Sequence, residues 1–138
     1  MSKGITILNP KSAPPVAGLY SHVAIAEPGR LAFIAGQVST NEKGNIVAPN
    51  DFVGQVPQVY DNIGRILKDL GADFSCVVEF TTYLVGEDKR APFFKAREEV
   101  FARLYPDKKY PPNTLLIISG LVKPEILLEV SAVARLPG

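Results

Sequence analysis

Glu129 is an isolated carboxylate within an apolar, strand-like run near the C-terminus of the chain, between Ile126 and Ala134. An ionisable group in such surroundings must face water, find a partner, or occupy a pocket that shifts its pKa. The third arrangement is how proteins prepare a general acid or base. Glu129 is therefore the first candidate for a catalytic residue. A glutamate of an edge strand that points to solvent would give the same pattern.

A second polar cluster precedes the neighbouring apolar run. It spans residues 110–114, and two prolines lead into Asn113 and Thr114. An asparagine amide both donates and accepts hydrogen bonds, and a threonine hydroxyl does the same, so both side chains could hold a ligand. Asn113 is also an ordinary turn residue after proline, and Thr114 is favoured in strands for its shape alone. Both interpretations stay open from these residues.

Two further residues have chemistry of their own. His22 is the single histidine, which excludes a metal site built from several histidines, and it could either relay a proton beside Tyr20 or simply pack. Cys76 is the single cysteine, so the chain forms no internal disulfide and suits a reducing compartment. We interpret Cys76 as a small buried apolar residue, because no nearby cation favours its thiolate.

Length and composition narrow the class of protein. A chain of 138 residues is expected to form one domain over residues 1–138. The formal net charge of +1 gives no electrostatic argument for nucleic acid as a partner. The sequence has no apolar stretch of the ~20 residues that a membrane span needs, and its N-terminus lacks a secretory signal. We therefore expect a cytoplasmic protein. We expect no metal and no cofactor, because nucleotide loops and carboxylate clusters are missing.

The apolar pattern predicts an α+β fold with the order β-β-β-α-β-α-β-β. Period-two and β-branched runs indicate strands, and three- and four-residue steps indicate helices. The expected strands are 5–8, 22–26, 31–35, 77–85, 114–119 and 126–134, and the expected helices follow residues 56–70 and 92–104. We predict a mixed sheet with both helices on one face. The other face carries many apolar residues, which predicts an oligomer that buries it.

Local signals refine these elements. Residues 27–30 lie between two apolar runs and predict a β-hairpin. Pro57 suits the first turn of the first helix, and Gly71 suits the position just after its end. Pro92 opens the second helix, and Pro106 stops it.

Several separated motifs together resemble the RidA (YjgF) family. They are Ala13-Pro14, Gly18-Leu19-Tyr20-Ser21, Phe33-Ile34-Ala35-Gly36-Gln37, Gln55, Asn62-Ile63, Gly71-Ala72, Tyr110-Pro111, Leu128-Glu129-Val130 and Ala132-Val133-Ala134. The match is collinear over nearly the whole chain. The resemblance implies a chorismate mutase-like fold, in which three copies form a homotrimer around a central barrel, with a cleft between each pair of neighbours.

The resemblance also implies an activity, the hydrolysis of reactive 2-imino or enamine acids to a 2-keto acid and ammonia. Glu129 matches the family's water-handling glutamate, and Tyr20 matches its cleft tyrosine. Gly36 matches the glycine that lets backbone approach the ligand. In the family, an arginine holds the substrate carboxylate as a bidentate pair.

The chain departs from the family at that arginine. Asn113 and Thr114 stand where the family has arginine and serine, and Leu115 takes the place often held by a reactive cysteine. A hydrogen bond to a charged group is worth roughly 1.5–3 kcal/mol, so losing the arginine predicts about ten- to a hundred-fold weaker capture of a carboxylate.

Three interpretations of this departure remain. Asn113 could bind a neutral or amide-bearing substrate while Glu129 still handles water, or another cation such as Arg30, Arg103 or Lys109 could enter the cleft. Alternatively, hydrolysis is lost, and the trimer binds a small metabolite or a partner protein. A ribonuclease role, attached to some relatives, has the least support because the chain lacks a basic, aromatic surface pattern.

Overall fold

The computed structural model describes residues 4–138 and contains six strands and two α-helices in the expected order. The strands are β1 (Ile5–Leu8), β2 (Val23–Ala26), β3 (Leu31–Gln37), β4 (Val77–Val85), β5 (Asn113–Ile118) and β6 (Leu128–Arg135), and the helices are α1 (Phe52–Asp69) and α2 (Arg90–Leu104). Two short 3₁₀ turns, Phe74–Cys76 and Glu87–Lys89, precede β4 and α2.

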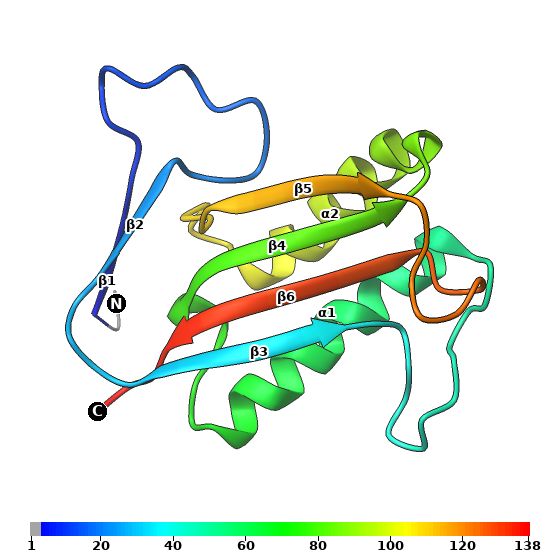
Figure 1. The fold of residues 1–138 in the computed structure, drawn as a ribbon. Helices are drawn as coiled ribbons and strands as arrows, with labels where there is room; N and C mark the ends of the chain where they lie inside the picture. The colour runs from blue at the N-terminus through cyan, green and yellow to red at the C-terminus, as the bar shows by residue number, and fades with distance from the viewer. Residues whose placement is uncertain (1–3) are drawn as a thin grey trace.

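Four strands form a mixed sheet in the order β3-β6-β4-β5, and both helices lie against one of its faces (Figure 1). The pair β4–β5 is parallel, while β6 runs antiparallel to both of its neighbours. This confirms the predicted α+β class, the mixed sheet and the placement of both helices. Strands β1 and β2 form a separate two-stranded antiparallel ladder beside the main sheet.

The predicted hairpin between β2 and β3 is wrong. β2 pairs with β1, and β3 pairs with β6, so the connection between them turns a corner rather than closing a ladder. Arg135 at the end of β6 lies in this corner and donates from Nη2 to the carbonyl of Pro28 at 2.8 Å and from Nε to that of Glu27 at 3.3 Å. The guanidinium thus takes up backbone acceptors of the connection, a long-range contact that the local sequence does not reveal.

The core lies between the sheet and the two helices. One face of α1 contributes the buried apolar side chains that the three- and four-residue steps predict. Opposite them, every second residue of β6, and of β4 from Phe80 onward, points into the same layer. The largest fully buried side chains of this layer include Tyr60, Phe80, Phe93, Phe101, Ile63, Leu67, Leu84 and Leu128. Cys76 is buried and free, as its sequence context indicates.

The ends of α1 follow from two capping groups. The carboxylate of Asp51 accepts from the backbone N–H of Gly54 at 3.1 Å and caps the first turn. Gly71 follows the helix with φ of +74°, which confirms its predicted position. The prediction for Pro57 is wrong, because the helix begins five residues earlier, at Phe52, and Pro57 lies inside it.

The face of the sheet opposite the helices is uncovered in the protomer. Leu31 and Phe33 of β3 and Leu116 of β5 are exposed there, and the Phe33 side chain keeps 77% of its surface accessible. Leu31 and Phe33 lie at alternate positions of one edge strand and Leu116 lies on the opposite edge strand, and exposed apolar surface of this kind marks sites of association. We call this surface the open face.

Candidate functional site

Glu129 lies on the open face, directly beside Gly36. A Cβ atom built on Gly36 would lie 2.5 Å from Cδ and 2.8 Å from Cγ of Glu129, and it would overlap a carboxylate oxygen. Any side chain at position 36 would therefore displace the carboxylate. Gly36 is required here for close approach and not for its φ.

A β-bulge produces this approach. Ile34 pairs with Ala132, and Gln37 pairs with Val130. Between these two pairs β3 has one residue more than β6. Bulges bend a strand and re-aim its residues, and they recur next to active sites. Here the extra residue brings the backbone of Gly36 over the Glu129 side chain.

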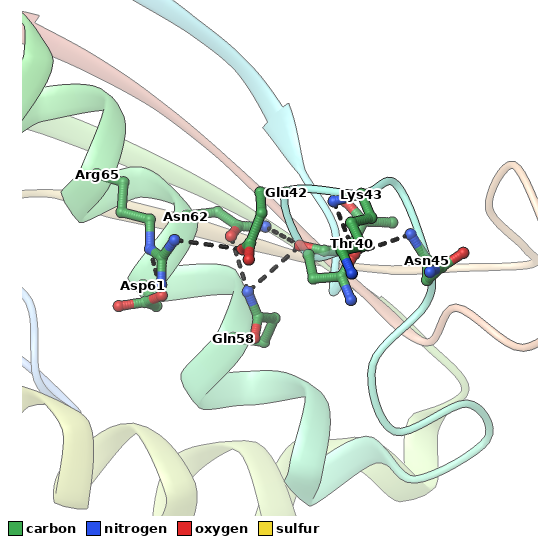
Figure 2. A network of polar contacts seen from close by, with 9 residues as sticks. Thr40, Glu42, Lys43, Asn45, Gln58, Asp61, Asn62 and Arg65 are labelled. Atoms are coloured by element: carbon green, nitrogen blue, oxygen red, sulfur yellow. Dashed lines mark hydrogen bonds and ion pairs between the residues drawn. The ribbon is translucent and has the colours of Figure 1, made fainter.

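Polar residues of α1 hold the chain that leaves this bulge (Figure 2). Asn62 donates from Nδ2 to the carbonyls of Val38 at 3.0 Å and of Thr40 at 2.8 Å. Gln58 donates to the Thr40 carbonyl at 3.3 Å and to Oδ1 of Asn62 at 2.9 Å. The helix thereby satisfies loop carbonyls and fixes the exit of β3.

Gln55 likewise forms hydrogen bonds with backbone groups at the start of β6. Its fully buried amide donates to the carbonyls of Ala48 at 3.0 Å and Glu125 at 2.7 Å, and its oxygen accepts from the N–H of Leu127 at 2.9 Å. Leu127 lies two residues before Glu129. Gln55 and Asn62, which carry the family resemblance, therefore support the two strands between which Gly36 and Glu129 meet.

Glu129 itself is half-buried and has no hydrogen bond or ion pair with any other residue between 4 and 138. It lies opposite Tyr83 in the β6–β4 ladder, on the face that the helices leave uncovered. An unpaired carboxylate at a glycine-lined position is free to accept from a water or a ligand.

Asn113 lies on the other face of the sheet. It is in register with Phe80, whose ring is buried under the helices, and its Oδ1 accepts from the hydroxyl of buried Thr82 at 2.7 Å. β5 is two strands from β6, about 10 Å, and Tyr83 is three residues beyond Phe80, roughly 10 Å more along the strand. Within one protomer, Asn113 and Glu129 do not converge.

Thr114 and Leu115, the next two residues of β5, face opposite sides of the sheet. Thr114 is exposed and is in register with Thr81 on the open face, the same face as Glu129. Leu115 is in register with Thr82 and packs against the core. The residue that occupies the family's cysteine position is therefore a core side chain in this chain.

Tyr20 lies in the loop between β1 and β2. Its hydroxyl accepts from the N–H of Ala17 at 3.3 Å, and its ring meets His22 edge-on, with centroids 5.9 Å apart. Nε2 of His22 lies 2.6 Å from the carbonyl of Pro14, so this histidine fastens the loop. In the part of the chain that the structure describes, no hydrogen bond joins Tyr20 to Glu129.

One cavity lies away from every predicted site residue. It has a volume of about 620 Å³ and lies between β1, the Phe74–Cys76 turn and the end of α2. Arg103 and Lys109, two of the cations considered for the cleft, line it together with Asp73 and Asp107. Arg30, the third, is exposed at the start of β3.

Arg97 of α2 is a polar residue that the sequence analysis missed. It is 3% exposed and its guanidinium carbon lies 5.0 Å from the ring centroid of Phe93 and 5.7 Å from that of Phe101. Burial lowers its pKa, while Tyr60 and Tyr110 act in the opposite direction. The signal was present in the four-residue spacing of Phe93, Arg97 and Phe101, which places a cation on the buried face of α2.

Residues 4–138 contain no group of three histidine, cysteine, aspartate or glutamate side chains placed to hold a metal ion. Within the same residues, neither helix combines the length and the apolar character that crossing a membrane requires.

Comparisons with known proteins identify relatives of nearly the same length. The family model described as Endoribonuclease L-PSP matches residues 10–136. A RutC family protein of Pyrococcus horikoshii is 32% identical over 124 residues, which cover 90% of this chain and 92% of that protein.

Solved structures agree. The Rid family protein YyfB of Yersinia pestis, described as of unknown function, has a TM-score of 0.84 at 29% identity and covers 96% of this chain and 99% of its own. TdcF of E. coli, solved with bound serine, has a TM-score of 0.68 at 21% identity and covers 94% and 98%. The fold, the family model and the separated motifs agree, and the chain is a member of the Endoribonuclease L-PSP, or RidA/YjgF, family.

Proposed function

We propose that this protein is a RidA-type hydrolase that converts a small imine or enamine to a carbonyl compound and ammonia. The observation that carries the proposal is the pairing of Glu129 with Gly36. A carboxylate without a hydrogen-bond or ion-pair partner among residues 4–138 lies against the backbone of Gly36, which carries no side chain. A catalytic base that acts on water needs this combination of a free acceptor and room for a small ligand.

The chemistry follows from that carboxylate. An enamine first tautomerises to its imine. Glu129 accepts a proton from a water whose oxygen bonds to the C=N carbon, and the proton is then passed to nitrogen. When the carbinolamine collapses, its hydroxyl proton passes through Glu129 to the amino nitrogen, the C–N bond breaks, and ammonia leaves. One water is consumed, and no redox step occurs.

We propose further that the cleft forms between protomers of a homotrimer. Glu129 and Thr114 lie on the open face, whereas Asn113 is bonded to Thr82 on the helix face and Tyr20 lies in a peripheral loop. These residues can share a ligand if a second copy brings its β5 edge and its loop against the open face of the first. The exposed apolar side chains of the open face supply the surface that such an assembly would bury.

The neutral Asn113 favours a second candidate function. Without a charge at this position the trimer could hold a small metabolite and not turn it over. TdcF, which shares the fold, has been solved with bound serine. In this alternative Glu129 serves binding alone.

The test is the release of ammonia and 2-oxobutanoate from freshly generated 2-iminobutanoate, above the spontaneous rate. We expect activity in the wild type and a loss of at least about 100-fold in Glu129→Gln, which keeps the shape but removes the base. Glu99→Gln, an exposed carboxylate of α2 on the helix side of the sheet, is the matched control and should keep full activity. Wild-type protein that does not exceed the spontaneous rate on this substrate, and on its carboxamide analogue, would favour the binding function.

A further inference from the structure

Arg97 is a buried cation without an anion. No carbonyl, carboxylate or hydroxyl oxygen of residues 4–138 accepts a hydrogen bond from its guanidinium, and Nε is fully shielded from solvent without a partner. Buried charges in proteins are almost always paired, because desolvation of an unpaired one is costly. The hydroxyl of Tyr60 does not supply the missing charge, because burial raises its pKa and keeps it neutral.

Aromatic rings surround the guanidinium and hold it in place. Phe93, Phe94 and Phe101 lie 5.0, 5.5 and 5.7 Å from its central carbon, measured to the ring centroids. Cation–π contacts of this kind offset part of the desolvation and fix the orientation of the planar group. They leave its in-plane N–H donors unused, since these point along the plane and not at the ring faces.

One end of the guanidinium lies against a surface loop of little bulk. The position that a Cβ would take on Gly18 is 3.5 Å from Nη2 of Arg97 and 3.9 Å from Cδ1 of Tyr20, so both groups border the same glycine. Gly18 is exposed and has no side chain, so at this position the loop borders the terminal nitrogens with backbone alone. Arg97 therefore lies beside the loop that carries the predicted cleft tyrosine.

We propose that Arg97 binds the carboxylate of this protein's ligand and makes it selective for an anionic substrate. A planar guanidinium fork matches a carboxylate, and a single cation suits a monoanion. Asn113 cannot take this role, because it is neutral and its oxygen is engaged by Thr82. The inference rests on the proposed function in that the ligand is the small imino acid, or its keto-acid product, of the Glu129 site.

The experiment measures binding of 2-oxobutanoate, the stable product, by titration calorimetry. Arg97→Met keeps the volume and the apolar contacts but removes the charge, and we expect it to weaken binding at least tenfold. Arg97→Lys keeps the charge without the fork and should lie between. Arg90→Met, on the same helix but exposed, is the control and should bind like the wild type. Equal affinity of Arg97→Met and wild type would overturn the proposal.

A second measurement needs no variant. Wild-type protein should bind 2-oxobutanoate at least tenfold more tightly than its neutral carboxamide, and equal binding would overturn the proposal even if Arg97→Met failed to fold. A wild type that binds neither compound, combined with an Arg97→Met variant whose oligomer dissociates, would assign the missing anion to a neighbouring protomer and would equally overturn it.

The two proposals fail separately. Imine hydrolysis whose KM is the same in wild type and Arg97→Met would leave the hydrolase standing and remove Arg97 from the site. Binding of the keto acid that depends on Arg97, in a protein that does not accelerate hydrolysis, would remove the hydrolase and leave the carboxylate site.

Discussion

Gly36 lies so close to Glu129 that the carboxylate occupies the position that a Cβ on residue 36 would take. The contact joins β3 to β6 at the bulge in their ladder, where the register slips by one residue. An isolated glutamate and a glycine after an apolar strand, which lie far apart in the sequence, are thus in direct contact in the candidate site. Substitutions of Gly36 or Glu129 should lower the activity and change the stability little, whereas substitutions in the core should mainly lower the stability.

Gly36→Ala should lower the rate of imine hydrolysis by about 10- to 100-fold, because the new methyl group pushes the Glu129 carboxylate from its position. The melting temperature should change little, since the half-buried glutamate can swing toward solvent. Gly120→Ala is the control, because a Cβ there meets nothing within 4 Å. A Gly36→Ala enzyme with unchanged kcat/KM would show that the contact does not position the base.

Phe33→Glu should convert the proposed trimer to monomers. The ring is 77% exposed on the open face of the protomer, and a carboxylate there would be buried against another copy without a partner. Molar mass from light scattering measures the outcome. Val53→Glu, an exposed apolar residue of α1 on the opposite side of the molecule, should leave the mass unchanged. A trimer that survives Phe33→Glu would place the interface elsewhere.

Gln55→Leu should destabilise the protein by about 3 kcal/mol, because it leaves the N–H of Leu127 without a partner and removes one of the two donors from each of the carbonyls of Ala48 and Glu125. Asp61→Asn, which weakens an exposed ion pair with Arg65, should change the free energy of unfolding by under about 0.5 kcal/mol. Urea denaturation at one protein concentration compares them. Similar values for the two variants would refute the assignment of Gln55 as a structural anchor.

Stability should fall as the pH rises above about 10, the ordinary pKa of tyrosine. Burial raises the pKa of Tyr60 and of Tyr105 in the folded protein, so both stay protonated there while the unfolded chain loses their protons. Their contribution is complete below pH 10 and is lost above it, by up to about 1.4 kcal/mol per pH unit for each group. Melting temperatures measured across this range should decline less steeply in Tyr60→Phe, and an unchanged slope would contradict the prediction.

Periodicity was sufficient for the order of the elements and for most of the core. The buried face of α1 and the alternate buried positions of β4 and β6 depend on local patterns that the sequence carries directly. The prediction of a hairpin between β2 and β3 was wrong because the pairing of β2 with β1 depends on distant groups. Arg135 is one of them, and it is more than one hundred residues from the carbonyls that it binds.

The candidate site residues came from the sequence, but their arrangement did not. Resemblance selected Gly36 and Glu129, and the structure places them together. It also selected Tyr20, Asn113 and Thr114, yet no single protomer brings these around Glu129, since adjacent residues of β5 face opposite sides of the sheet. The burial of Arg97 was not predicted, because the long side chain of an arginine in an apolar helical pattern usually extends to solvent.

The central claim is that Glu129 hydrolyses substrate in a cleft completed by a second protomer, and complementation tests it most directly. Glu129→Gln and Tyr20→Ala are each expected to be inactive alone. Co-refolded in equal amounts, they should form mixed trimers in which about a quarter of the clefts combine two intact halves, so close to a quarter of wild-type ammonia release from 2-iminobutanoate should return. Mixtures that stay as inactive as their components, although mass analysis shows mixed trimers, would contradict a site shared between protomers.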